Sequence, residues 1–220
     1  MKRPVYHFCS TIQERGIFLP SLAVDTEVVK NEPMLFNCDF PSAYRLGGPL
    51  TRQFLRQLPD DWLDCPIVVD SRVHMLMPGW WPCIPGWHHD DIARGADGQP
   101  DYDDLPYRSE HLMGLVNGHL APTRFGLGEV TLPAVDGVVY AGWDPLVAAA
   151  VAEERLRPYS APSGVYIQFD WQSFHEGVQA VESGWRWFIR LSRNTIRTST
   201  CTNEVRRQVQ VYMADPRSGW

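Results

Sequence analysis

The sequence predicts a mainly β protein, a sandwich or barrel with a few helices packed outside it. Short segments with strand patterning recur along the chain, and glycine- and proline-rich turns separate them. Only two segments show a clear helical pattern. The chain has 220 residues, of which 44% are hydrophobic and 21% are charged, so it can bury a sizeable core within one domain.

The first half of the chain contains four predicted strands and one predicted helix. Runs of apolar and β-branched residues predict strands over residues 5–9, 33–37, 67–70 and 72–77. Residues 50–58 place leucine and phenylalanine at helical spacing, and Pro59 ends that helix.

The second half contains more strands and one clear helix. The predicted strands cover residues 111–116, 123–127, 138–141, 165–169, 185–191 and 205–213. The helix begins with Asp144 as its N-cap and Pro145 at its first position, and an alanine-rich run follows. We expect residues 1–220 to form a single domain, in which an αβ extension of about residues 1–60 packs on a β core of about residues 65–215.

The charge balance argues against a nucleic-acid-binding surface. The chain has 20 lysines and arginines and 26 aspartates and glutamates, which gives a net charge of −6. No apolar run reaches the ~18 residues of a membrane helix. Five widely spaced cysteines without a CxxC pair do not predict a structural zinc site. Because no secretion signal is recognisable either, we expect a cytoplasmic protein with reduced thiols.

The densest group of potential metal ligands is the run His88-His89-Asp90-Asp91. A histidine and a carboxylate two positions apart on a strand project to the same face. His88 with Asp90 and His89 with Asp91 are therefore both possible ligand pairs. His175, which follows a later predicted strand, can supply the second histidine. Two histidines and one carboxylate with open positions on the metal are typical of non-haem Fe(II) oxygenases.

These motifs resemble those of the Fe(II)/2-oxoglutarate-dependent dioxygenases, most of all the phytanoyl-CoA dioxygenase-like branch. The W-H-x-D motif of that branch is similar to residues 87–90, and its G-T-x-F segment is similar to residues 121–125. A strand that ends in F-x-x-x-x-x-H-x-G is similar to residues 169–177, and Arg186 follows the histidine of that motif by eleven residues. The resemblance covers roughly residues 70–213.

The resemblance implies a double-stranded β-helix core of the jelly-roll or cupin type. It also implies that His88, Asp90 and His175 bind Fe(II), because the tryptophan before His88 matches the motif. The second register, with His89 and Asp91 as ligands, stays open as the alternative.

The resemblance further implies that the enzyme consumes 2-oxoglutarate as a cosubstrate while it hydroxylates or otherwise oxidises a substrate. Arg186 is expected to bind the far carboxylate of 2-oxoglutarate, and Thr123 to form a hydrogen bond with the cosubstrate. We expect Trp80, Trp81 and Arg190 to line the substrate pocket.

The loop over residues 94–106 is long and rich in aspartate, so it is either a solvated surface loop or a lid over a site. The expected substrate is a small molecule or a side chain of another molecule; nucleic acid and membrane are not expected partners, and the oligomeric state is left open. The alternative function is that of a catalytically inactive jelly-roll protein with a binding or structural role.

Overall fold

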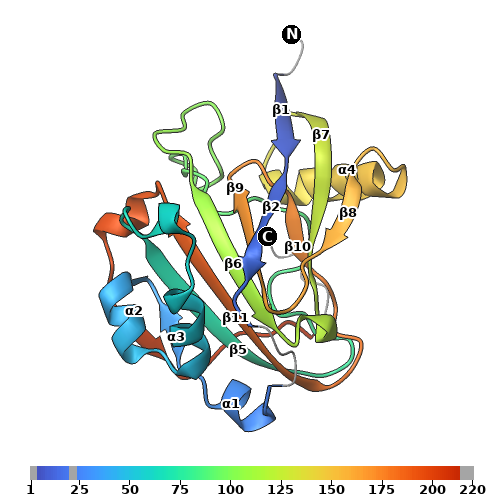
Figure 1. The fold of residues 1–220 in the computed structure, drawn as a ribbon. Helices are drawn as coiled ribbons and strands as arrows, with labels where there is room; N and C mark the ends of the chain where they lie inside the picture. The colour runs from blue at the N-terminus through green and yellow to red at the C-terminus, as the bar shows by residue number, and fades with distance from the viewer. Residues whose placement is uncertain (1–3, 20–23, 214–220) are drawn as a thin grey trace.

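The computed structural model describes residues 4–19 and 24–213, and its core consists of two antiparallel β-sheets (Figure 1). The larger sheet has the strand order β2-β9-β6-β11-β5-β4. In the smaller sheet, β7 pairs with β1, β10 and β8. A separate ladder joins β12 to β3. The strands are β1 (Val5–Ser10), β2 (Ile12–Ile17), β3 (Met34–Phe36), β4 (Cys38–Asp39), β5 (Val68–Leu76), β6 (Glu110–Val116), β7 (Thr123–Pro133), β8 (Arg157–Ser160), β9 (Val165–Asp170), β10 (His175–Gly177), β11 (Gly184–Arg193) and β12 (Glu204–Arg206).

Helices flank the two sheets on their outer sides. They are α1 (Thr26–Lys30), α2 (Phe40–Leu46), α3 (Pro49–Arg56) and α4 (Val139–Ala152), with 3-10 turns at Asp60–Trp62, Gly118–Leu120 and Ile196–Ser199. Figure 1 shows α1, α2 and α3 gathered beside β5 and β11, whereas α4 lies beside β7. None of the helices in the described ranges is long and apolar enough to cross a membrane.

Apolar side chains from both sheets fill the space between them. Met113 on β6 and Phe169 on β9 pack in one cluster with Phe125 on β7. The opposite face of the larger sheet packs against α1 and α3 through a second cluster, which contains the fully buried Trp187. Trp187 therefore faces away from its neighbour Arg186, as the alternation along a strand predicts. This arrangement confirms the predicted mainly β fold with flanking helices and a double-stranded β-helix core.

The N-terminal segment is part of the sheets to a greater extent than the sequence predicts. β1 pairs with β7 from Val5 opposite Pro133 to Ser10 opposite Gly128, and β2 pairs with β9. Each of these strands extends one of the two core sheets. The sequence pattern could not reveal this, because the partner strands lie more than 100 residues away in the chain.

The predicted strand over residues 138–141 is wrong, since α4 begins at Val139 and contains both Asp144 and Pro145 in its interior. Asp144 resembles an N-cap in the sequence but has a different role in the structure. Its Oδ1 accepts a hydrogen bond from the backbone N–H of Trp87 at 2.8 Å. The side chain thus holds the loop that leads into the His88 motif.

The predicted strand over residues 205–213 is also largely wrong, because only Glu204–Arg206 pairs, as β12 with β3. Val209 and Val211 instead pack against two different apolar clusters. The alternation in the sequence therefore does not mark a strand, since Val209 and Val211 are half-buried whereas Val205 and Met213 are exposed. Near its end, this segment returns to the core, where Tyr212 exchanges backbone hydrogen bonds with Trp81.

The inner face of the larger sheet carries a row of polar side chains. β5 and β11 pair with His74 opposite Arg186 and with Asp70 opposite Arg190. Since alternate residues of a strand share a face, Arg72 lies on the same side as these four residues. Charged groups between two sheets are costly unless they have partners, so this row marks the place where a site is expected.

Candidate metal centre

Three potential metal ligands converge between the sheets: His88, Asp90 and His175. Their ligand atoms all lie within 4.8 Å of one another. His175 is the first residue of β10, and His88 lies in the loop after β5. A short antiparallel bridge joins them, in which each backbone N–H donates to the other's carbonyl at 3.0 and 3.1 Å. Asp90, two positions after His88, thereby reaches the same point as His175.

Both histidines have a tautomer that suits metal binding. Nδ1 of His88 lies 2.9 Å from the carbonyl oxygen of Gly86, and Nδ1 of His175 lies 3.0 Å from that of Ser173. An Nδ1–H that donates to a carbonyl leaves the lone pair on Nε2, which is the usual arrangement for a metal-binding histidine. Burial and the neighbouring His175 lower the pKa of His88 to about 4, so its ring is neutral at physiological pH.

Asp90 is held as an anion. Its Oδ2 lies 3.1 Å from Nε2 of His175 and forms an ion pair with Arg190. Burial acts to raise the pKa of Asp90, but the charge of Arg190 and the contact with His175 outweigh it and hold that pKa well below its ordinary value. Arg190 also lies 3.7 Å from Asp70. Arg190 is thus placed as the partner of a candidate ligand, and it also lines the inner cavity beside that ligand.

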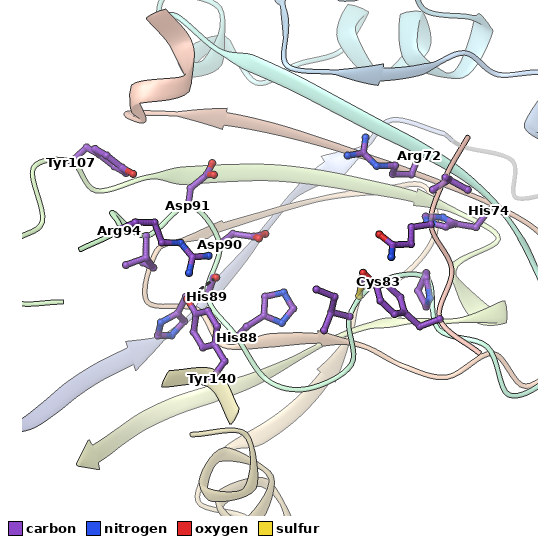
Figure 2. Close-up of a pocket in the computed structure, with 16 residues that line it drawn as sticks. Arg72, His74, Cys83, His88, His89, Asp90, Asp91, Arg94, Tyr107 and Tyr140 are labelled. Carbon is purple, nitrogen blue, oxygen red and sulfur yellow. Dashed lines mark hydrogen bonds between the residues drawn. The ribbon is translucent and has the colours of Figure 1, made fainter. Parts of the chain in front are cut away.

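The alternative register does not converge on the same point. Nδ1 of His89 lies 2.8 Å from the hydroxyl of Tyr102, and its ring packs on Phe174 with 3.7 Å between centroids. Asp91 pairs with Arg197 at 3.4 Å. Figure 2 shows the ring of His88 and the carboxylate of Asp90 on one side of the chain and His89 on the other. Among the residues that the structure describes, the group formed by His88, Asp90 and His175 is the one that could hold a metal ion.

An inner cavity of about 200 Å³ lies against the three candidate ligands and contains Arg186 and Thr123. Arg186 is 2% exposed, and its Nη2 donates to Oγ1 of Thr123 at 3.1 Å. Its Nε is buried without a hydrogen-bond partner in the described part of the chain. Burial lowers the pKa of Arg186 to about 10, so the guanidinium stays charged. A buried cation without a counter-ion beside a cavity is suited to bind the carboxylate of a ligand.

A second, outer cavity of about 580 Å³ opens to solvent beside the inner one. The two cavities share Arg72, His74, Pro82, Cys83, His88 and Asp90. Trp80 and Trp81, which the sequence predicts as pocket walls, line neither cavity. Trp80 packs against an apolar cluster around Leu76, and the backbone of Trp81 pairs with Tyr212. The aromatic side chains that do line the outer cavity are Tyr107, Tyr140 and Tyr212.

Sequence reasoning overlooked Arg72 and His74, although a signal for them existed. In β5, titratable residues recur at every second position from Asp70 to His74, whereas Val69 and Val73 on the other face are buried. Such a period places one polar face on an otherwise apolar strand. His74 is 2% exposed, and its Nδ1 is buried without a partner in the described part of the chain.

The loop over residues 94–106 lies next to the outer cavity, as a lid would require. Arg94, at the start of the loop, and Tyr107, directly after its end, line that cavity. Tyr102 anchors the middle of the loop through hydrogen bonds to Nδ1 of His89 at 2.8 Å and to the hydroxyl of Tyr140 at 3.1 Å.

Comparison with known proteins gives only distant matches. No protein-family model and no curated protein matches the chain. HygX from Streptomyces hygroscopicus, solved as the apo protein and with iron bound, is 10% identical with a TM-score of 0.39 over 89% of this chain and 83% of its own. EvdO2 from Micromonospora carbonacea var. aurantiaca, solved with 2-oxoglutarate, is 13% identical with a TM-score of 0.38 over 72% of this chain. CytC3, solved with Fe(II) and alpha-ketoglutarate, is 10% identical with a TM-score of 0.33 over 58% of this chain.

The matched regions span 65% of the EvdO2 chain and 42% of the CytC3 chain, less than two thirds of either. At identities of 10–13%, these matches do not establish a family for the chain.

Proposed function

We propose that this protein is an Fe(II)- and 2-oxoglutarate-dependent dioxygenase that hydroxylates or otherwise oxidises a small molecule or a side chain. The proposal rests on one observation, that a candidate ligand group and a buried arginine lie in the same cavity. A group of two histidines and one carboxylate lies at the wall of a cavity, and the same cavity contains a buried arginine that has no carboxylate partner among the described residues.

The residues present fit both groups. Two imidazole nitrogens and one carboxylate oxygen are a ligand set that Fe(II) accepts while it keeps open positions. When bound, iron and 2-oxoglutarate would supply the oxidising power, since the oxidative decarboxylation of 2-oxoglutarate accompanies transfer of an oxygen atom from O₂ to the substrate. The far carboxylate of 2-oxoglutarate matches the free donors of Arg186, which Thr123 holds in place.

The surrounding residues keep the site dry and fix its charges. Met113, Phe169 and Phe188 form apolar walls of the inner cavity and exclude water from it. Arg190 keeps Asp90 ionised and in one orientation, because it contacts Oδ2 of that side chain. Partners of this kind orient metal ligands in other metal sites.

One observation favours the alternative, a catalytically inactive jelly-roll protein with a binding or structural role. Oδ2 of Asp90 already has two partners, Arg190 and His175, so its charge is compensated without a metal. Metal binding and this ion pair must therefore coexist in the proposed enzyme, with Asp90 shared between the metal and Arg190.

The test is spectroscopic and needs no substrate. Purified protein is mixed with Fe(II) and 2-oxoglutarate under argon, and a weak visible charge-transfer band should develop as 2-oxoglutarate chelates the iron. His175→Ala and Asp90→Ala should each abolish this band and iron-dependent succinate formation, whereas His89→Ala should keep the metal. Absence of the band in the wild-type protein would support the inactive alternative. Loss of metal in His89→Ala but not in His88→Ala would identify the other register.

A further inference from the structure

The outer cavity has the size and the walls of a site for a small organic molecule. Its volume of about 580 Å³ falls within the roughly 300–1,000 Å³ that is typical of small-molecule sites. Apolar and aromatic side chains form much of its wall, namely Ile84, Ile92, Tyr107, Tyr140, Val209 and Tyr212. His88 and Asp90 belong to the same wall, so a molecule in this cavity lies against the candidate metal ligands.

Most of the arginines that are buried or half-buried in the described residues have a carboxylate partner. Five of these eight lie within 4.0 Å of one: Arg15, Arg124, Arg190, Arg193 and Arg197. The three without such a partner are Arg52, Arg72 and Arg186. Arg52 donates to two backbone carbonyls at the surface. Arg186 and Arg72 both line the inner cavity, and Arg72 lines the outer cavity as well.

Arg72 uses only one end of its guanidinium within the protein. Its Nη1 donates to the carbonyl oxygens of Leu35 and Ser71 at 3.1 and 2.8 Å, and the group lies 5.5 Å from the ring centroid of Phe36. Nη2 and Nε donate to no group among the described residues. Burial lowers the pKa of Arg72, but its ordinary value is so high that the side chain stays charged. A partly desolvated cation with two free donors is a preformed site for an anion.

The carboxylates near Arg72 are already engaged with other arginines. Asp70 pairs with Arg197 at 2.5 Å and with Arg190 at 3.7 Å, and Asp91 pairs with Arg197. The outer cavity contains a second arginine, Arg94, which also has no carboxylate within 4.0 Å in the described part of the chain and donates to a backbone carbonyl. The cavity therefore has unbalanced positive charge, which attracts anionic ligands.

We propose that the substrate is a small organic acid, whose carboxylate or phosphate group binds Arg72 while its apolar part lies in the outer cavity beside His88 and Asp90. This proposal rests on the proposed function, because it takes His88 and Asp90 as the place of oxidation. Figure 2 shows Arg72 and Arg94 on opposite sides of these two residues. Arg72, which shares its strand with His74, is the more buried of the two arginines and is the anchor; Arg94, on the exposed loop, contributes to attraction of the anion.

The experiment compares anionic and neutral probes of the same shape. Benzoate, phenyl phosphate and benzamide are titrated by calorimetry into the protein, both alone and loaded with Fe(II) and 2-oxoglutarate under argon. In the wild-type protein, one of the two anions should bind at least about 10-fold tighter than benzamide, and which anion does so distinguishes a carboxylate from a phosphate substrate. Arg72→Met should remove this preference, a loss of about 10- to 100-fold in affinity for the anion. Arg72→Lys, which keeps the charge but loses the paired donors of the guanidinium, should show an intermediate effect.

Arg52→Met is the matched control, since it also removes a half-buried arginine without a carboxylate partner, and it should bind the probes as the wild-type protein does. Equal binding of anions and benzamide in the wild-type protein, or a preference that survives in both Arg72 variants, overturns the proposal. So does a rise of the 2-oxoglutarate Kd in Arg72→Met as large as that in Arg186→Met, because Arg72 would then bind the cosubstrate. Failure of the proposed function has a different signature: the charge-transfer band is absent in the wild-type protein, whatever the probes do.

Discussion

Replacing Arg186 with methionine should remove the binding site for the far carboxylate of 2-oxoglutarate without disturbing the metal ligands. Nη2 of Arg186 donates a hydrogen bond to Oγ1 of Thr123 at 3.1 Å, and its buried Nε has no partner in the described part of the chain. Donors therefore remain for a bidentate contact with a carboxylate. Such a contact contributes roughly 2–3 kcal/mol, so its loss should raise the 2-oxoglutarate Kd about 30- to 150-fold. Methionine keeps much of the apolar volume, so the loss is assigned to the charge and its hydrogen bonds.

The assay is a titration of iron-loaded protein with 2-oxoglutarate under argon, followed by the visible band. Iron affinity should stay within a few fold of wild type in Arg186→Met, and Arg52→Met should not change either affinity. Thr123→Val, which removes only the hydrogen bond that positions Arg186, should cost roughly 2- to 12-fold. Wild-type affinity for 2-oxoglutarate in Arg186→Met, or a greater loss in Arg190→Met, would show that the cosubstrate arginine is wrongly assigned.

Three further predictions follow from the surroundings of the site. Arg190→Met should lower iron affinity about 10- to 100-fold, measured by calorimetry with Fe(II), because it removes the partner that orients Asp90; an unchanged affinity would contradict this role. Burial lowers the pKa of His74 to about 3 and that of His111 to about 4, so the unfolded chain takes up protons below pH 6.5 that the folded protein does not. Stability of the metal-free protein should therefore fall as the pH drops from 6.5 towards 4, by up to about 1.4 kcal/mol per pH unit for each histidine, and urea unfolding of His111→Gln should show a smaller slope. Amide exchange in residues 94–106 should slow when an anionic probe fills the outer cavity, and equal exchange with and without it would argue against a lid.

The convergence of His88, Asp90 and His175 on one point could be derived from the sequence only in part. The rule that residues two positions apart share a face assumes a strand, yet His88 and Asp90 lie in a loop after β5. The rule still applies at this point because the backbone of His88 forms an extended bridge with His175. The identity of the third ligand could come only from the resemblance to a family, since nothing local in the sequence joins residues 88 and 175.

The walls of the cavities could not be predicted from the sequence. Trp80 and Trp81 are close to His88 along the chain, but the space beside the ligands is occupied by segments that come from far away. Tyr140 lies on α4, and Tyr212 lies in the C-terminal segment, whose backbone pairs with Trp81. Nearness in the sequence says little about which side chains share a cavity when most of the pairing is non-local.

The charges of the site, like the outer cavity, favour a small anionic substrate. Five arginines and three carboxylates of the described residues form its charged row: Arg72, Arg94, Arg186, Arg190, Arg197, Asp70, Asp90 and Asp91. These groups leave two positive charges in excess, and the pair of Glu176 with Arg124 adds no net charge. Fe(II) brings two positive charges and 2-oxoglutarate two negative ones, so the loaded site keeps the same excess. Because uncompensated charge in a partly dry site is costly, an anionic substrate lowers this excess, and Arg72 is the more buried of the two arginines that line the outer cavity.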